Sequence, residues 1–212
     1  MAGRIKGVAF DLNGTLVDSV EQHVRAWARA FKRNGFHVEE AKLRPFIGLS
    51  SPKVVRAFVG NVNDQIMEKV DTDYKTYFGE LINEIKAFPE APESLSSLRR
   101  AGIKIAVASS SELAVALRVL EQSKLRPYAD ALVGGDEVLL GKPDPEIYIE
   151  AFRRIEVTPR MGAVVGDTEY DTVPAHRIGA LAIAVQRAGK EVKSADLIFA
   201  SLADAVAEIL GA

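Results

Sequence analysis

The chain has 212 residues, of which 48% are hydrophobic and 26% charged, a composition typical of a globular protein with one large domain or one domain carrying an insert. Its formal net charge of −2 argues against nucleic acid as a partner, and its apolar runs are shorter than the roughly 18 residues that span a membrane. The absence of cysteine excludes disulfides, a thiol nucleophile and cysteine metal sites.

The first strand is expected at residues 5–10, where a short apolar run begins close to the N-terminus. No signal peptide precedes this run, so we expect a cytoplasmic protein. An amphipathic helix should follow, because apolar residues recur at helical spacing from Val20 to Phe31. It is expected to end near Asn34-Gly35, a dipeptide that favours a left-handed stop.

The next part of the chain, residues 39–87, shows no strand-like alternation and predicts two helices. One begins at the Ser-Ser-Pro sequence that starts at Ser50, with proline in the first turn. The other has an apolar face between Ile66 and Ile85. We therefore predict an all-helical block at residues 19–86, placed directly after the first strand.

From residue 93 onward, helices and strands alternate regularly. Strands are expected at residues 103–108, 131–133, 163–165, 181–185 and 197–199, and helices at 93–100, 113–120, 145–155, 171–178 and 202–210. Such alternation predicts an α/β fold with a doubly wound parallel sheet and right-handed crossovers. The predicted domains are an α/β core of residues 1–18 and 87–212 and an inserted, all-helical cap of residues 19–86.

Four polar residues stand just after predicted strands: Asp11, Ser109, Lys142 and Asp167. Ligands of open α/β sheets bind at this edge, although any one of these residues alone is explained better by a solvated loop. Together they are chemically complementary, since two carboxylates suit Mg²⁺, a hydroxyl can donate to a phosphate oxygen, and an ammonium adds positive charge. A carboxylate nucleophile in such a site can take a phosphoryl group, forming an aspartyl-phosphate that water hydrolyses.

Four short motifs contain these residues. They are Asp11-Leu-Asn-Gly-Thr-Leu-Val-Asp18, Val107-Ala-Ser-Ser-Ser111, Gly141-Lys-Pro-Asp-Pro145 and Gly166-Asp-Thr-Glu-Tyr-Asp171. In this order and spacing, which cover the whole chain, they resemble the haloacid dehalogenase superfamily of phosphotransferases, and more narrowly its phosphoglycolate phosphatase-like branch with a helical cap. The resemblance implies Mg²⁺-dependent hydrolysis of a small-molecule phosphate monoester, with phosphoglycolate as the example.

The resemblance also implies roles for the residues at matching positions. Asp11 would be the nucleophile and a ligand of Mg²⁺, and Lys142 would neutralise both the nucleophile and the phosphate. Asp167 and Asp171, together with the backbone carbonyl of Asn13, would complete the metal site. The helical insert would be a cap that closes over the core and excludes water.

Further residues are implied in binding. The implied phosphate-binding residues are Thr15, which would support the loop, Ser109, Ser110 and Lys142. The family often places a substrate-facing loop between cap helices, which makes Arg44, Gly48 and Ser50 candidates for specificity, although an ordinary helix–helix turn explains them equally well. His23, His37 and His176 show no metal-ligand spacing and are interpreted as surface or packing residues, with His23 also a cap candidate.

One residue departs from the family pattern. Phosphatases of this family usually carry a second Asp two residues after the nucleophile, whereas this chain has Asn13. That Asp protonates the leaving alcohol and later activates water, and an amide can do neither. Losing a general acid/base typically costs about 10²–10⁴-fold in rate, so the chain as given is expected to be impaired. Folding, substrate binding and the metal site are expected to survive.

Several alternatives stay open. Asn13 is consistent with a substitution made to trap a bound state, with a natural enzyme that uses another acid or a good leaving group, and with a catalytically inactive phosphometabolite-binding protein. A sugar-phosphate mutase, or a phosphonate or haloacid hydrolase of the same superfamily, is the alternative among enzymes. The expected partner is a small phosphorylated metabolite, and the sequence is compatible with a monomer or a homodimer.

Overall fold

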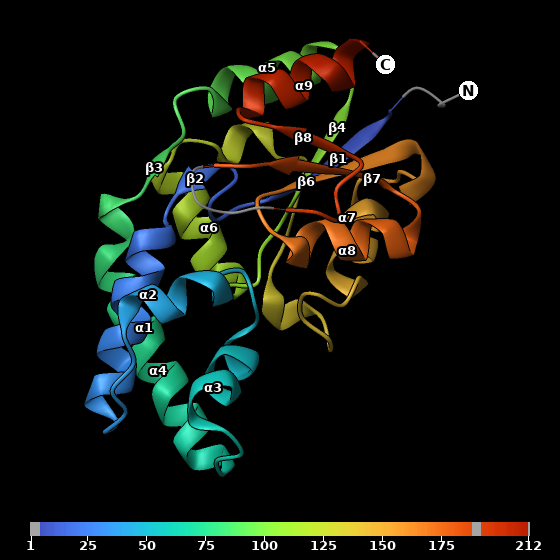
Figure 1. The fold of residues 1–212 in the computed structure, drawn as a ribbon. Coiled ribbons are helices and arrows are strands. Elements are labelled where there is room, and N and C mark those ends of the chain that lie inside the picture. Colours follow the sequence, from blue (N-terminus) through green and yellow to red (C-terminus); the bar gives the residue numbers. More distant parts are fainter. Residues whose placement is uncertain (1–4, 188–191, 212) are drawn as a thin grey trace.

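The structure, a computed structural model, describes residues 5–187 and 192–211 (Figure 1). The predicted core also includes residues 1–4, 188–191 and 212, which lie outside the described residues. The central feature is a six-stranded sheet with the strand order β5-β4-β1-β6-β7-β8, in which every pairing is parallel. Its strands are β1 (Gly7–Asp11), β4 (Lys104–Ala108), β5 (Ala131–Val133), β6 (Gly162–Gly166), β7 (Leu181–Val185) and β8 (Leu197–Phe199).

Helices cover both faces of this sheet, as a doubly wound fold requires. One face packs against α5 (Ala91–Arg100), α6 (Leu113–Gln122) and α9 (Leu202–Gly211), and the other against α7 (Glu146–Arg154) and α8 (Glu169–Ile178). Successive side chains of a strand point to opposite faces, so Val8 and Phe10 lie in the first core and Ala9 in the second. The predicted α/β fold with a doubly wound parallel sheet is confirmed.

The helices of the insert lie together beside the sheet, at the lower left of Figure 1. They are α1 (Val20–Arg33), α2 (Glu40–Leu43), α3 (Ser51–Val59) and α4 (Asp64–Leu81). The longest two, α1 and α4, pack through aromatic side chains: the rings of Trp27 and Tyr74 stack with centroids 3.8 Å apart. Pro52 lies in the first turn of α3, as its position in the sequence predicted.

The prediction that residues 39–87 contain no strand is wrong at its C-terminal end. A two-residue strand β3 (Lys86–Ala87) pairs antiparallel with β2 (Val17–Asp18), and this ribbon links the helical insert to the core. Two residues are too few to show alternation, so only the partner strand defines them. Elsewhere the predicted bounds differ from the observed ones by a few residues, as at β1. Among the described residues, none of the helices has the length and apolar character needed to cross a bilayer.

Candidate active site

The carboxyl edge of the sheet brings the first and fourth motifs together. Asp11 is the last residue of β1, and Asp167 directly follows β6, the neighbouring strand. The turn after β1 must pass close to Asp167, and a Cβ at position 14 would come within 2.5 Å of the Asp167 Oδ2 atom. The φ angle of Gly14 is also +89°, which side chains disfavour. Glycine is therefore required at position 14 for both reasons.

Lys142 is fully buried, and its ammonium pairs with two carboxylates, those of Asp11 and Asp171. Its Nζ atom lies 2.5 Å from Asp11 Oδ1 and 2.8 Å from Asp171 Oδ1, and it also donates to the Ala108 carbonyl at 3.1 Å. Burial alone would lower the pKa of Lys142, but Asp11 and Asp171 raise it above its ordinary value. The lysine is therefore a fixed positive charge beside Asp11.

Asp171 is held by more hydrogen bonds than the sequence suggested. Its Oδ1 atom accepts from Lys142 and, at 2.7 Å, from the Tyr148 hydroxyl, while Oδ2 accepts from the Thr168 hydroxyl at 2.7 Å. Burial would raise the pKa of Asp171, but the Lys142 ammonium and these hydrogen bonds hold it below its ordinary value. Tyr148 was not predicted, because in the sequence it looks like one more core residue on the apolar face of α7.

The donor set suits Mg²⁺. Asp11, Asp167 and Asp171 are buried, and each offers a carboxylate oxygen within 4.8 Å of those of the other two. Three carboxylates and the Lys142 ammonium leave a net charge of −2, which a divalent cation would neutralise. Burial, with repulsion from Asp171 and Asp167, outweighs Lys142 and raises the pKa of Asp11 to about 7. A cation beside these oxygens would favour the ionised form that a nucleophile needs.

Asn13 lies two residues beyond Asp11, in the stretch between β1 and α1, the first helix of the insert. Its Oδ1 atom accepts a hydrogen bond from the Ser19 hydroxyl at 2.8 Å, and its Nδ2 atom lies 3.4 Å from Ser109 Oγ. Ser109, at the end of β4, is fully buried, and its Oγ atom also accepts from the Ser111 N–H at 3.2 Å. The side chains of positions 13 and 109 are therefore brought together beside the nucleophile.

Two further residues, Ser110 and Thr15, were expected to take part in phosphate binding. Ser110 lines the cavity above Asp11. Thr15 is fully buried, and its Oγ1 atom has no hydrogen-bond partner among the described residues. Among the described residues, therefore, no hydrogen bond of the Thr15 hydroxyl supports the loop.

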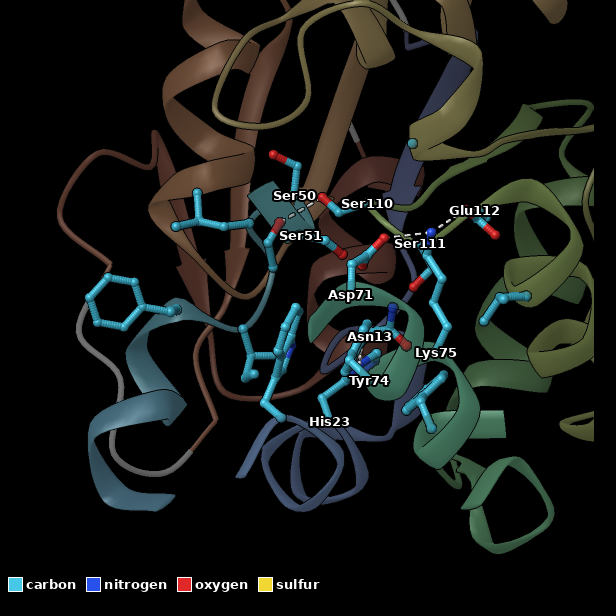
Figure 2. Close-up of a pocket in the computed structure, with 18 of the residues that line it drawn as sticks. Asn13, His23, Ser50, Ser51, Asp71, Tyr74, Lys75, Ser110, Ser111 and Glu112 are labelled. Carbon is cyan, nitrogen blue, oxygen red and sulfur yellow. Dashed lines mark hydrogen bonds and ion pairs between the residues drawn. The ribbon is translucent and has the colours of Figure 1, made fainter. Parts of the chain in front are cut away.

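A cavity of about 180 Å³ opens above Asp11 and Asn13, between the core and the helical insert (Figure 2). This is smaller than the roughly 300 Å³ at which pockets for drug-sized ligands begin, so it suits a small metabolite. Gly48 and Ser50, two of the three specificity candidates, line it. The third, Arg44, does not: it is exposed, and its guanidinium pairs with the Glu21 carboxylate.

Polar contacts join the insert to the core around this cavity. The Ser110 hydroxyl donates to the Gly48 carbonyl at 2.7 Å. Lys53, on α3, donates from Nζ to the carbonyls of Gly141 at 2.6 Å and Lys142 at 2.9 Å. The insert is thus closed onto two of the four motif-bearing loops.

His23 is a packing residue rather than a surface one. Its ring stacks on Phe78 with centroids 4.0 Å apart, and Nδ1 lies 2.7 Å from the Tyr74 hydroxyl. Burial lowers the pKa of His23 to about 3, so the ring is neutral at pH 7. Its Nε2 atom has no hydrogen-bond partner among the described residues.

The fold and this site together define a hydrolase of the haloacid dehalogenase-like class. A model of the haloacid dehalogenase-like hydrolase family matches residues 8–185, and the chain belongs to this family. It is similar to the phosphorylated carbohydrates phosphatase of Thermotoga maritima, with 31% identity over 180 residues that cover 82% of each chain. It is also similar to the phosphoglycolate phosphatase of Nitrosospira multiformis, with 29% identity over 182 residues, 82% of this chain and 80% of the relative.

Solved structures agree with this assignment. A hydrolase from Pseudomonas syringae superposes with a TM-score of 0.88 at 25% identity, covering 96% of this chain and 97% of the other. The resemblance to phosphoglycolate phosphatase-like members of the superfamily, inferred from four motifs, is therefore confirmed.

Proposed function

We propose that the protein hydrolyses a small phosphate monoester with Mg²⁺ as its cofactor. The observation that carries this proposal is the position of Asp11 at the base of a small cavity, ion-paired to the buried Lys142 and next to Asp167 and Asp171. Relatives named as phosphatases support the same chemistry.

In the proposed reaction, an Asp11 carboxylate oxygen attacks the phosphorus of the substrate, and the bond from phosphorus to the ester oxygen breaks. The leaving oxygen becomes the alcohol by taking a proton from water, because the amide of Asn13 has none to give, whereas Asp at this position would supply it directly. The aspartyl-phosphate that forms is then hydrolysed by water, which returns the Asp11 carboxylate and releases inorganic phosphate. Lys142 keeps positive charge beside Asp11 in both steps, and Ser109 is placed to hold a phosphoryl oxygen. Mg²⁺ bound by Asp11, Asp167 and Asp171 would stabilise the charge on the phosphoryl oxygens.

The insert acts in this proposal as a cap of residues 19–86 over a core of residues 1–18 and 87–212. The contacts of Lys53 and Ser110 support a closed arrangement in which water is excluded from the cavity. Asn13 cannot protonate the leaving alcohol or activate water, so turnover by the chain as given should be about 10²–10⁴-fold slower than with Asp.

A second candidate function is stoichiometric binding of a phosphometabolite without turnover, and Asn13 is the observation that favours it. A sugar-phosphate mutase would need the same missing acid. A phosphonate or haloacid hydrolase of the same superfamily is also compatible with the fold, but the acidic cluster and the phosphatase relatives favour phosphate ester hydrolysis.

The test is phosphate release with Mg²⁺ from a panel of small phosphate esters, for the chain as given and for Asn13→Asp. We expect turnover to rise about 10²–10⁴-fold in the variant and to disappear when Asp11→Asn is added. Mass spectrometry of the unsubstituted chain is the control for deamidation at Asn13-Gly14, which would introduce Asp without a mutation. If Asn13→Asp releases no phosphate while the esters still bind, the binding-protein function replaces the proposed one.

A further inference from the structure

The wall of the cavity carries an unusual balance of charge. Beyond Asp11 itself, its charged lining side chains are Asp71, Lys75, Glu112 and Asp136. Lys75 is the only cation among the described residues of this lining, and its ammonium is already ion-paired twice, at 2.6 Å to Asp71 Oδ2 and at 2.5 Å to Glu112 Oε1 (Figure 2). Three carboxylates and one ammonium leave this wall with a net charge of −2.

The other nearby cations do not compensate this charge. Arg44 pairs with Glu21 outside the cavity, and Lys53 points its ammonium at two backbone carbonyls. Lys142 is fully buried and paired with Asp11 and Asp171, and it does not line the cavity. His23 lines the cavity but is neutral, because burial lowers its pKa to about 3. Among the described residues, therefore, no unpaired positive charge faces the leaving group.

The same wall offers hydrogen-bonding groups for hydroxyls. The carboxylates of Asp71 and Glu112 line the cavity, and their oxygens can accept from ligand hydroxyls. Ser50, Ser51 and Ser111 also line the cavity with side chains that donate and accept. Trp27 and Tyr74 also line the cavity, and their stacked rings offer an apolar surface to the carbon atoms of a ligand.

We propose that the substrate is the phosphate ester of an uncharged, hydroxyl-bearing alcohol such as a small polyol or sugar, and that esters with a carboxylate in the leaving group bind poorly. This inference rests on the proposed phosphatase function and narrows it. Phosphoglycolate, to which the motif resemblance pointed, would place a carboxylate against the wall formed by Asp71, Lys75, Glu112 and Asp136. Repulsion from its net negative charge should weaken binding of such an ester by about tenfold.

The first test is calorimetric binding with Mg²⁺ to the unsubstituted chain, which does not depend on turnover. Two matched pairs exchange a CH₂OH group for a carboxylate: 2-hydroxyethyl phosphate against phosphoglycolate, and glycerol 3-phosphate against 3-phosphoglycerate. We expect the hydroxyl member of each pair to bind about tenfold more tightly. Equal affinities, or tighter binding of the carboxylates, would overturn the inference. Tightest binding of ethanolamine phosphate would overturn it too, by showing that the wall selects a cation.

The second test changes the wall. Glu112→Gln removes one carboxylate, leaves Lys75 paired with Asp71 alone and reduces the net charge of the wall from −2 to −1, so selectivity should move by about threefold to tenfold toward the carboxylate member of each pair. Asp71→Asn should act in the same direction and serves if Glu112→Gln does not fold. The matched control is Glu121→Gln, an exposed residue of α6 outside the cavity, for which no change is expected. An unchanged ratio in both wall variants would contradict the assignment.

The two proposals fail in different ways. If Asn13→Asp hydrolyses the carboxylate esters as fast as the polyol esters, phosphatase function stands and the inference on the substrate falls. If none of the esters binds with Mg²⁺ and none is hydrolysed by Asn13→Asp, both proposals fall.

Discussion

The hydroxyl of Ser19, the residue that precedes the first cap helix, donates to the side-chain oxygen of Asn13 at 2.8 Å. Ser19 is fully buried, so this bond couples the side chain at position 13 to the junction between core and cap. In Asn13→Asp the same hydroxyl would donate to a carboxylate oxygen. A hydrogen bond to the charged form favours that form, so Ser19 should lower the pKa of the carboxyl introduced at position 13.

This predicts that Ser19→Ala, made in the Asn13→Asp background, raises that pKa by about one unit, the equivalent of losing a hydrogen bond to a charged group. Because the general acid must be protonated to act, the alkaline limb of the kcat–pH profile should move to higher pH. Ser123→Ala is the control, since Ser123 is buried at the end of α6 and bonds only to helix carbonyls. A limb that stays in place would show that Ser19 does not tune position 13.

Lys142 should also be important for stability. Lys142→Met removes a fully buried ammonium from Asp11 and Asp171 and leaves two buried carboxylates without their partner. Breaking a buried ion pair in this way costs about 3–5 kcal/mol, so the free energy of unfolding should fall by that amount. Urea denaturation with EDTA measures it without a contribution from metal.

The control for this experiment is Lys104→Met, an exposed lysine at the start of β4, which should change the free energy of unfolding by about 0.5 kcal/mol or less. Phosphate release in the Asn13→Asp background should be lost in Lys142→Met and kept in Lys104→Met. If Lys142→Met is as stable as Lys104→Met, the ion pairs of Lys142 with Asp11 and Asp171 do not stabilise the fold.

The sequence predicted that Asp11, Ser109 and Asp167 would lie at one edge of the sheet, because their positions depend only on where the strands end. Asp11 and Asp167 each close or follow a buried apolar run, and parallel strands deliver such residues to one edge of the sheet. Ser109 follows β4 in the same way. The order of the strands did not need to be known, since any doubly wound arrangement places these side chains at the carboxyl edge.

The leaving-group end could not be predicted in this way. Asp71 and Lys75 are one turn apart on α4, where they look like an ordinary surface ion pair, and Glu112 precedes a helix of the core. Only the docking of the cap on the core brings the three together. Arg44 is the opposite case, because its position in the sequence suggests the cavity whereas the structure places it outside the lining, paired with Glu21.

Lys53 should stabilise the closed position of the cap. Its ammonium donates to the carbonyls of Gly141 and Lys142, and burial lowers the pKa of Lys53. In the Asn13→Asp background, Lys53→Met removes both bonds and so lowers the fraction of closed cap. Apparent substrate affinity falls with that fraction, so KM should rise by about tenfold, with a smaller effect on kcat. Lys69→Met, on the exposed side of α4, is the control. An unchanged KM in Lys53→Met would mean that these bonds do not limit closure.

The last prediction concerns acid stability and His23. The folded protein keeps this ring neutral down to a pKa of about 3, whereas in the unfolded chain it takes up a proton near pH 6.5. Above pH 6.5 the ring is neutral in both states, so its lowered pKa does not change the free energy of unfolding. Below pH 6.5 the unfolded chain binds a proton that the folded protein does not, which favours unfolding. Stability should fall by up to about 1.4 kcal/mol per pH unit between pH 6.5 and 3.

His23→Gln should remove this contribution to the pH dependence, because an amide does not titrate in that range. Its free energy of unfolding will be lower at pH 7, since the stacking on Phe78 is lost, but it should decline less steeply than that of the unsubstituted chain as the pH falls from 6.5 to 4. His37→Gln, at an exposed position, is the matched control and should keep the original slope. Urea denaturation at each pH, with EDTA present, measures the three slopes. Parallel slopes for all three proteins would show that the ring is protonated in the folded state at these pH values, and that its burial between α1 and α4 is not maintained.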